Sequence, residues 1–212
     1  MKKAAIKILI LLMVLFPAIA FPASNFVKVK IPNNASVEIP RNWYILDGNQ
    51  RMTLDAYNES VGRISITKLT AVLTNLDEVV AKLDVTHSLK GGITQREAKN
   101  LTQSQIKQFD NDARKEFADQ IQRINASLLE WKGTTKRTVG MKEMGLVILV
   151  SECKAGPIEG TGNLYFYIVI VYNGKDSFAI YLTYLEDFRT VLKPICERII
   201  SSIWINYFDR NL

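Results

Sequence analysis

The sequence predicts an α+β domain in which helices cover both faces of a mostly antiparallel sheet. Short stretches in the first and last thirds of the chain alternate apolar and polar residues, which is typical of strands. The middle and the C-terminal end carry apolar residues at three- and four-residue spacing, which is typical of amphipathic helices. A hairpin through Asn173-Gly174 is apolar on both faces, so each face needs a covering layer. Together these observations predict an α/β/α sandwich.

The first strands are expected before residue 71. In the stretch Phe26–Ile31 the odd positions Val27, Val29 and Ile31 alternate with lysines, and Ser36–Ile39 repeats the extended pattern. The segment Pro40-Arg41-Asn42-Trp43 then predicts a turn that carries Trp43 to the core. Two further strands are expected at Met52–Tyr57 and Arg63–Thr70.

Two helices are expected in the middle of the chain. Asn75 and Glu78 form a capping pattern, which predicts a helix that ends near Gly91. Thr94 and Glu97 repeat this pattern and predict one long helix. Its apolar stripe consists of Ile106, Phe109, Ala113, Phe117, Ile121 and Ile124.

The last part of the chain returns to strands and ends in a helix. Strands are expected at Leu128–Lys132, Thr135–Val139 and Leu146–Cys153, and the hairpin joins Leu164–Tyr172 to Ser177–Tyr184. The stretch 154–163 is rich in turn residues and predicts a mobile surface connection. The terminal helix is expected from about Val191 to Ile203, with Pro194 in its first turn, where proline is tolerated.

The first twenty residues are organised as a secretory signal peptide. A leader with three lysines precedes a wholly apolar stretch at residues 8–16, and Ala18-Ile19-Ala20 is a small-x-small site. Cleavage is expected between Ala20 and Phe21, which leaves residues 21–212 as one domain, periplasmic or secreted. The alternative is an uncleaved anchor, but an apolar run of under ~15 residues is shorter than the ~20 needed to cross a membrane. No transmembrane segment is expected in the mature chain.

The charge of the chain argues against a nucleic-acid partner. The sequence has 27 Lys and Arg against 21 Asp and Glu, a net charge of +6 that falls to +3 without the three leader lysines. The remaining basic residues are interspersed with acids, whereas a nucleic-acid-binding protein usually gathers them on one face. A solvated surface is the expected reading.

No catalytic or metal-binding motif is visible. His87 is the single histidine, which excludes sites built on two imidazoles. At the end of the predicted helix it is expected to interact with the helix dipole, or to be a surface residue, rather than to act as a base. The glycine-containing segments 133–136 and 160–162 lack the spacing of phosphate-binding loops. We therefore expect no enzyme activity, no metal and no cofactor.

Several features together resemble a known family. They are the Ile-Pro-x-x-Trp turn at 39–43, the segment Trp131-Lys132-Gly133, the tyrosine-rich hairpin and a last helix that ends in the stretch Arg198–Ile203. In this order they resemble the PsbP/Mog-like superfamily, in particular exported bacterial members akin to the DcrB and LpqN proteins. The resemblance implies an α/β/α sandwich and an accessory or binding role, because PsbP supports a photosynthetic complex and the Mog protein binds a small GTPase. It assigns no functional residue, and the helical insertion is longer here than in that pattern.

Two functions from different classes follow from these observations. The first is a non-catalytic accessory or binding protein that docks on an envelope partner. The second is a small-molecule-binding protein or cryptic hydrolase with an aromatic-lined pocket. Trp43, Trp131, Tyr165 and Tyr167 are the candidates for such a pocket, and the alternative for all four is packing in the core.

The two cysteines are candidates for a disulfide. An exported chain passes through an oxidising compartment, and Cys153 ends a predicted strand while Cys196 lies on the inward side of the terminal helix. A helix packed on that sheet could bring the two residues within bridging distance. The alternative is two separate buried thiols, because free cysteine packs well as a small apolar group.

Overall fold

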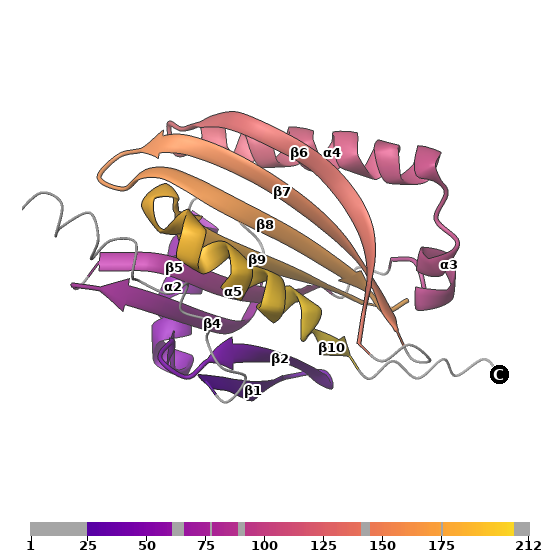
Figure 1. Ribbon diagram of the computed structural model, residues 1–212, viewed down its shortest axis with the longest axis horizontal. Coiled ribbons are helices and arrows are strands. Elements are labelled where there is room, and N and C mark those ends of the chain that lie inside the picture. The colour runs from indigo at the N-terminus through magenta and orange to yellow at the C-terminus, as the bar shows by residue number, and fades with distance from the viewer. Residues whose placement is uncertain are drawn as a thin grey trace, which may run out of the picture.

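The computed structural model describes residues 25–60, 66–76, 78–88, 92–140, 145–174 and 176–205. Its main feature is a seven-stranded antiparallel sheet with the strand order β3-β4-β5-β9-β8-β7-β6, beside a three-stranded sheet β1-β2-β10 (Figure 1). The strands are β1 (Phe26–Ile31), β2 (Ala35–Pro40), β3 (Tyr44–Ile45), β4 (Ile66–Asn75), β5 (Glu78–Ser88), β6 (Ser127–Val139), β7 (Leu146–Ile158), β8 (Gly162–Tyr172), β9 (Ser177–Leu185) and β10 (Trp204–Ile205). The helices are α2 (Gly48–Ser60), α3 (Gln95–Lys99), α4 (Gln103–Gln122), the 3₁₀ turn η2 (Glu186–Phe188) and α5 (Arg189–Ser201).

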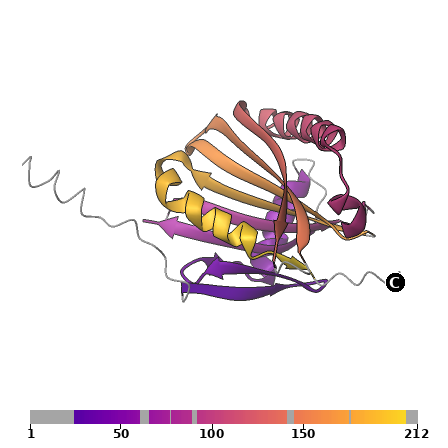
Figure 2. The ribbon, with the colours of Figure 1, turned by 45° about the vertical axis from the view of Figure 1, so that its right-hand side comes forward.

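Helices lie on both faces of the large sheet, which confirms the predicted α+β sandwich. Figures 1 and 2 show α5 on one side of the sheet and α4 on the other. The α5 side holds the larger core cluster, which includes Leu192 and Ile199 of the helix and Tyr167 of β8. The α4 side holds a smaller cluster built on Phe117 and Ile121. The sheet is therefore buried unequally on its two faces.

The hairpin β8–β9 confirms the prediction of a two-sided apolar strand pair. Val169 of β8 belongs to the α5-side cluster, whereas its neighbour Ile168 belongs to the α4-side cluster. The turn is closed by a hydrogen bond from the Asn173 N–H to the Asp176 carbonyl at 3.0 Å, and Gly174 adopts a φ of 77°. Glycine pays no steric cost at such a φ, which explains its place in the turn.

In the first strands, burial differs from the predicted alternation. Ile31 is buried and Val29 is half-buried, but Val27 is 38% exposed. The turn after β1 has two residues with positive φ, Asn33 at 69° and Asn34 at 59°, as tight hairpins require. Trp43 reaches the core as predicted, because only 5% of it is exposed.

Two predicted elements are wrong in type. Met52–Tyr57 was expected to be a strand but lies in helix α2, which begins with reciprocal bonds at 2.9 Å between Asp47 and Gln50. A helix was expected from the cap at Asn75 to about Gly91, but Glu78–Ser88 is strand β5 and pairs with both β4 and β9. Its apolar residues satisfy both spacings, and pairing with two neighbouring strands decides between them.

The predicted long middle helix is two helices. The capping box of Thr94 and Glu97 is confirmed, but the helix that it starts, α3, ends at Lys99. A second capping box, formed by Thr102 and Gln105, then starts α4. The helices are separate because Thr102 is extended, with φ −75° and ψ 162°.

Further differences lie in the C-terminal half. Strand β7 continues to Ile158, so most of the predicted mobile connection 154–163 is paired strand, and the turn covers residues 159–161. Helix α5 begins at Arg189, which places Pro194 in its second turn instead of the first. Proline has no N–H, so the Thr190 carbonyl lacks its usual helical partner at position 194. Thr190 and Pro194 are both exposed, so water can bond to this carbonyl instead.

Candidate functional site

Three of the four predicted pocket aromatics are core residues. Trp43, Tyr165 and Tyr167 are 5%, 3% and 0% exposed and belong to the α5-side cluster. The Tyr165 ring stacks on Tyr184 with centroids 5.6 Å apart, and the Arg189 guanidinium lies over it at 4.7 Å. Tyr165 and Tyr167 both pack against Tyr184, and Trp43 is buried in the same cluster, so all three take the alternative role of core packing that the sequence left open.

Trp131, the fourth aromatic, attaches α4 to the sheet. Its indole Nε1 donates a hydrogen bond to Asp110 Oδ1 at 2.8 Å, and Thr134 Oγ1 donates to the same oxygen at 2.8 Å. Thr134 also shares a 2.7 Å hydrogen bond with Ser151 of β7. Asp110 is the α4 residue of this network, so these bonds fix the position of α4 over β6 and β7. Trp131 therefore positions a wall of the cavity described below without lining it.

The predicted disulfide is absent, because Cys153 and Cys196 are both free and buried. Cys153 belongs to the α4-side cluster and Cys196 to the α5-side cluster, so the sheet lies between them. Burial raises the pKa of both thiols above the ordinary range, and the neighbouring carboxylates Glu152 and Glu197 add to the effect. Both cysteines act as small apolar core residues.

His87 lies in strand β5 and not at a helix end, so its predicted role at a helix dipole is wrong. Its ring packs on Phe178 with centroids 4.8 Å apart, and its Nε2 forms a 2.8 Å hydrogen bond with Asp176. The Asn33 side chain contacts the same ring nitrogen at 2.9 Å. His87 thus links the β1–β2 turn to the β8–β9 hairpin, a structural role.

The open part of the molecule lies on the α4 side of the sheet. Helix α4 packs mainly along β6, and the α4-facing side chains of β8 and β9 are half-buried except for Ile168, which is buried. On the same face, Thr67 of β4 donates to Asp55 of α2 at 2.5 Å, which places α2 near the opposite margin. Two adjoining cavities lie along this face. We call them the hairpin cavity, next to the β8–β9 turn, and the distal cavity, next to the β7–β8 turn, and together the α4 trough.

The two cavities share four residues, Glu116, Phe117, Gln120 and Tyr181, so the trough is continuous. The hairpin cavity has a volume of about 390 Å³ and the distal cavity about 580 Å³. Strand β8 forms the floor from Leu164 to Tyr172, which is about 27 Å at ~3.4 Å per residue. The trough is long enough for an extended segment of a partner and wide enough at each end for a small ligand.

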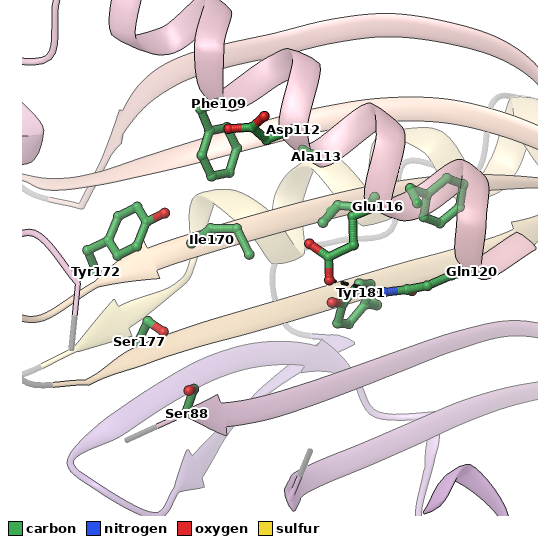
Figure 3. Close-up of a pocket in the computed structure, with 12 residues that line it drawn as sticks. Ser88, Phe109, Asp112, Ala113, Glu116, Gln120, Ile170, Tyr172, Ser177 and Tyr181 are labelled. Atoms are coloured by element: carbon green, nitrogen blue, oxygen red, sulfur yellow. Dashed lines mark hydrogen bonds between the residues drawn. The ribbon is translucent and has the colours of Figure 1, made fainter. Parts of the chain in front are cut away.

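The hairpin cavity is lined by α4 on one side and by β8 and β9 on the other (Figure 3). Phe109 and Ala113 of α4 face Ile170 and Tyr172 of β8 across the space. Gly92 is packed against the Tyr172 ring so closely that a Cβ at position 92 would lie 2.5 Å from it. The absence of a side chain at Gly92 therefore lets the Tyr172 ring take its place in the wall.

The distal cavity is more polar. Its β5 margin carries Lys82 and Asp84, which form an ion pair at 2.7 Å, and Thr70 of β4 donates to the same carboxylate group at 2.7 Å. Phe166 and Leu164 of β8 form the apolar side. The charges on the β5 margin are thus paired within the protein, whereas the apolar side stays open to a ligand or partner.

Sequence reasoning missed the residues of the trough. Phe109 and Ala113 were assigned to the core stripe of α4, but they are only half-buried, whereas Ile106, Phe117 and Ile121 are buried. The feature of the sequence that could have indicated the trough is the width of the apolar stripe on α4. Its apolar residues extend beyond the surface that one strand edge can cover, and the excess lines the cavity.

The described residues hold neither a cluster of metal ligands nor a membrane-spanning helix. No group of three or more His, Cys, Asp or Glu side chains among them could hold a metal ion. No helix in this part of the chain combines the length and the apolar character needed to cross a membrane. The predicted signal peptide, with its cleavage between Ala20 and Phe21, lies outside the described residues and stays a prediction.

Comparison with known proteins identifies the fold. No protein-family model matches the sequence, and no curated protein is significantly similar to it. The solution structure of cyanobacterial PsbP (CyanoP) from Synechocystis sp. PCC 6803 matches with a TM-score of 0.56 at 14% identity, covering 91% of this chain and 99% of that chain. A crystal structure from Bacteroides thetaiotaomicron VPI-5482 has a TM-score of 0.40 at 13% identity and covers 86% of this chain and 49% of that chain. The DcrB-, LpqN- and Mog-like parts of the resemblance stay predictions, but the chain has a PsbP-like fold.

Proposed function

We propose that this protein is a non-catalytic, exported accessory or binding protein that docks on an envelope partner through the α4 trough. The observation that carries the proposal is the half-buried face of β8 and β9, where the ring of Tyr181 and the side chain of Ile170 remain accessible beside α4. The PsbP-like fold supports it, because the resemblance drawn from the sequence implies accessory roles. An apolar strip flanked by paired charges is typical of the centre and rim of a protein interface.

Export is part of the proposal, and the mass of the mature protein tests it. Protein recovered from the periplasm or the medium is expected to lack residues 1–20 and to begin at Phe21. A full-length mass in that fraction would contradict the assignment of the leader.

Site-specific photo-crosslinking in the native host tests the docking surface. A photoreactive amino acid at Thr86 or Thr183, both on the trough margin, is expected to give the same partner adduct. The matched control is Thr190, a threonine exposed on α5 at the other face of the sheet. Adducts from Thr190 alone, or no reproducible adduct from either trough position, would refute docking through the trough.

A second function, binding of a small molecule, is favoured by the hairpin cavity. Its volume of about 390 Å³ lies in the range of small-ligand sites, and its walls are mainly apolar and aromatic. The hydrolytic form of this alternative has less support, because the single histidine, His87, turns its ring to Phe178 in the α5-side cluster. Ala113→Trp fills the cavity, and it is expected to abolish the thermal shift that a bound ligand causes while leaving crosslinking at Thr183 intact. Equal shifts in both proteins would refute a ligand in this cavity.

A further inference from the structure

The hairpin cavity has walls of an unusual kind for a simple packing gap. Four of the described residues that line it are aromatic, with Phe109 and Phe117 on α4 and Tyr172 and Tyr181 on the strands. Figure 3 shows Phe109, Tyr172 and Tyr181 around the space below the helix. Aromatic faces carry a negative quadrupole that attracts a cation placed over them.

In the part of the lining that the structure describes, the charged residues are both acidic. Asp112 and Glu116, four residues apart on α4, are the two charged residues among the described residues of its lining, and no Lys or Arg is among these described residues. Figure 3 shows the Glu116 carboxylate pointing from the helix toward Tyr181. Gln120 Nε2 donates to Glu116 Oε1 at 3.3 Å, which helps to hold this side chain over the cavity. Asp112 has no hydrogen-bond or ion-pair partner among the described residues.

The acidity of the cavity contrasts with the rest of the chain. The full sequence carries a net charge of +6, yet the basic residues of α4 next to these carboxylates, Arg114 and Lys115, lie outside the lining. Two like charges at i and i+4 repel each other and destabilise an isolated helix slightly. A cation between them would remove this repulsion and would also lie against the aromatic walls.

We propose that the hairpin cavity binds a small organic cation, a primary ammonium group on an aromatic or short aliphatic body. The apolar body fits against Ile168, Ile170 and the rings, and the ammonium group lies between the two carboxylates. An anionic ligand would meet two like charges. A neutral apolar ligand would displace water from both carboxylates without supplying a counter-charge or a hydrogen-bond donor, which costs free energy. This inference rests on the small-molecule function proposed above and names the ligand class of that same cavity.

Three probes of the same shape test the proposal. Phenethylamine carries the positive charge, 2-phenylethanol is its neutral analogue and 3-phenylpropanoate its anionic one. Titrations followed by amide chemical shifts are expected to show phenethylamine binding with perturbations at Ile170 and Tyr181. The alcohol and the carboxylate are expected to bind at least about tenfold more weakly, which corresponds to about 1.4 kcal/mol. Absence of phenethylamine binding, or equal affinity for the alcohol, overturns the proposal.

Variants locate the effect. The double variant Asp112→Asn/Glu116→Gln keeps the shape of both side chains and is expected to weaken phenethylamine binding at least about tenfold. The matched control is Asp119→Asn/Glu130→Gln, which removes the same two charge types at exposed positions outside the hairpin cavity and is expected to change the affinity less than about twofold. Equal weakening by both pairs would mean that net charge alone is responsible, and it would refute the site. If the alcohol binds as tightly as the amine and Ala113→Trp blocks both, the small-molecule function stands and only its cationic ligand class fails.

Discussion

The buried side chain of Gln95 forms hydrogen bonds with backbone groups at the ends of β7 and β8. Its loss is expected to destabilise the sheet. It is 3% exposed, and its amide bonds the ends of two strands. Nε2 donates to the carbonyls of Val147 at 3.0 Å and Tyr172 at 2.7 Å, and Oε1 accepts from the Val147 N–H at 2.8 Å. The pairing of β7 with β8 begins only at Leu149, so Gln95 satisfies backbone groups that have no ladder partner there.

Gln95→Leu keeps the size of the side chain and removes all three hydrogen bonds. Each buried backbone group left without a partner costs about 1–3 kcal/mol, and half-buried Tyr172 admits some water. We therefore expect a loss of about 3 kcal/mol in the free energy of unfolding. For a domain of this size that loss lowers Tm by about 6–12 °C.

Urea unfolding and amide hydrogen exchange measure the effect. The Val147 N–H is expected to lose protection selectively, because its acceptor is gone. The matched control is Gln108→Leu, the same change at an exposed position of α4, which is expected to alter stability by less than about 0.5 kcal/mol. Equal effects of the two substitutions, or an unchanged exchange rate at Val147, would refute the reasoning.

Three further outcomes are expected. Cys153 and Cys196 should both take up a thiol label in the denatured, unreduced protein and react slowly in the native one, because burial raises the pKa of both thiols; labelling only after reduction would reveal a disulfide. Asp110→Ala removes the acceptor of two hydrogen bonds that hold α4, so it should cost about 2 kcal/mol and speed amide exchange along the helix, and unchanged exchange would contradict this anchoring role. The Lys154 ammonium and the side-chain amide of Asn163 hold the pKa of Glu186 below its ordinary value. This ion pair should therefore stabilise the protein above the ordinary carboxyl pKa and lose its effect as pH falls through the lowered one, and an NMR titration should show a higher Glu186 midpoint in Lys154→Met.

The sandwich could be predicted from the sequence because the hairpin strands are apolar on both faces, and a sheet with such strands has to be covered on both sides. Residues such as Val169 and Ile168 face opposite clusters, and any sheet with such strands needs two covering layers. The terminal helix was predicted within two residues at each end for the same reason, since its stripe matches one face of the sheet. The strand β5 could not be predicted, because Val80 and Leu83 fit a helical spacing as well as Ala81, Leu83 and Val85 fit a strand. Its pairing with β4 and β9 is not encoded in its own residues.

The trough was out of reach for a different reason. A cavity exists where an apolar helix stripe exceeds the surface that covers it, and that difference depends on where α4 lies over the sheet. The position of α4 depends in turn on Asp110 and Trp131, residues 21 positions apart whose contact no local pattern predicts. For Trp131 the sequence offers a place in the core or in a pocket. Its role as a hydrogen-bond donor to a helix is a third possibility that neither expectation includes.

The small sheet β1-β2-β10 joins strands from the two ends of the described chain. Strand β2 pairs on one edge with β1, which directly precedes it in the sequence. Its other edge pairs with Trp204 and Ile205 of β10. Ser202, just before them, accepts a hydrogen bond from the Glu38 N–H at 2.8 Å across 164 positions of sequence. Contacts of such high sequence separation form late, since the intervening loop must close first. During synthesis the N-terminal hairpin therefore lacks its third strand until residues 204 and 205 have been made, so the small sheet is completed only after every strand of the large sheet has been synthesised.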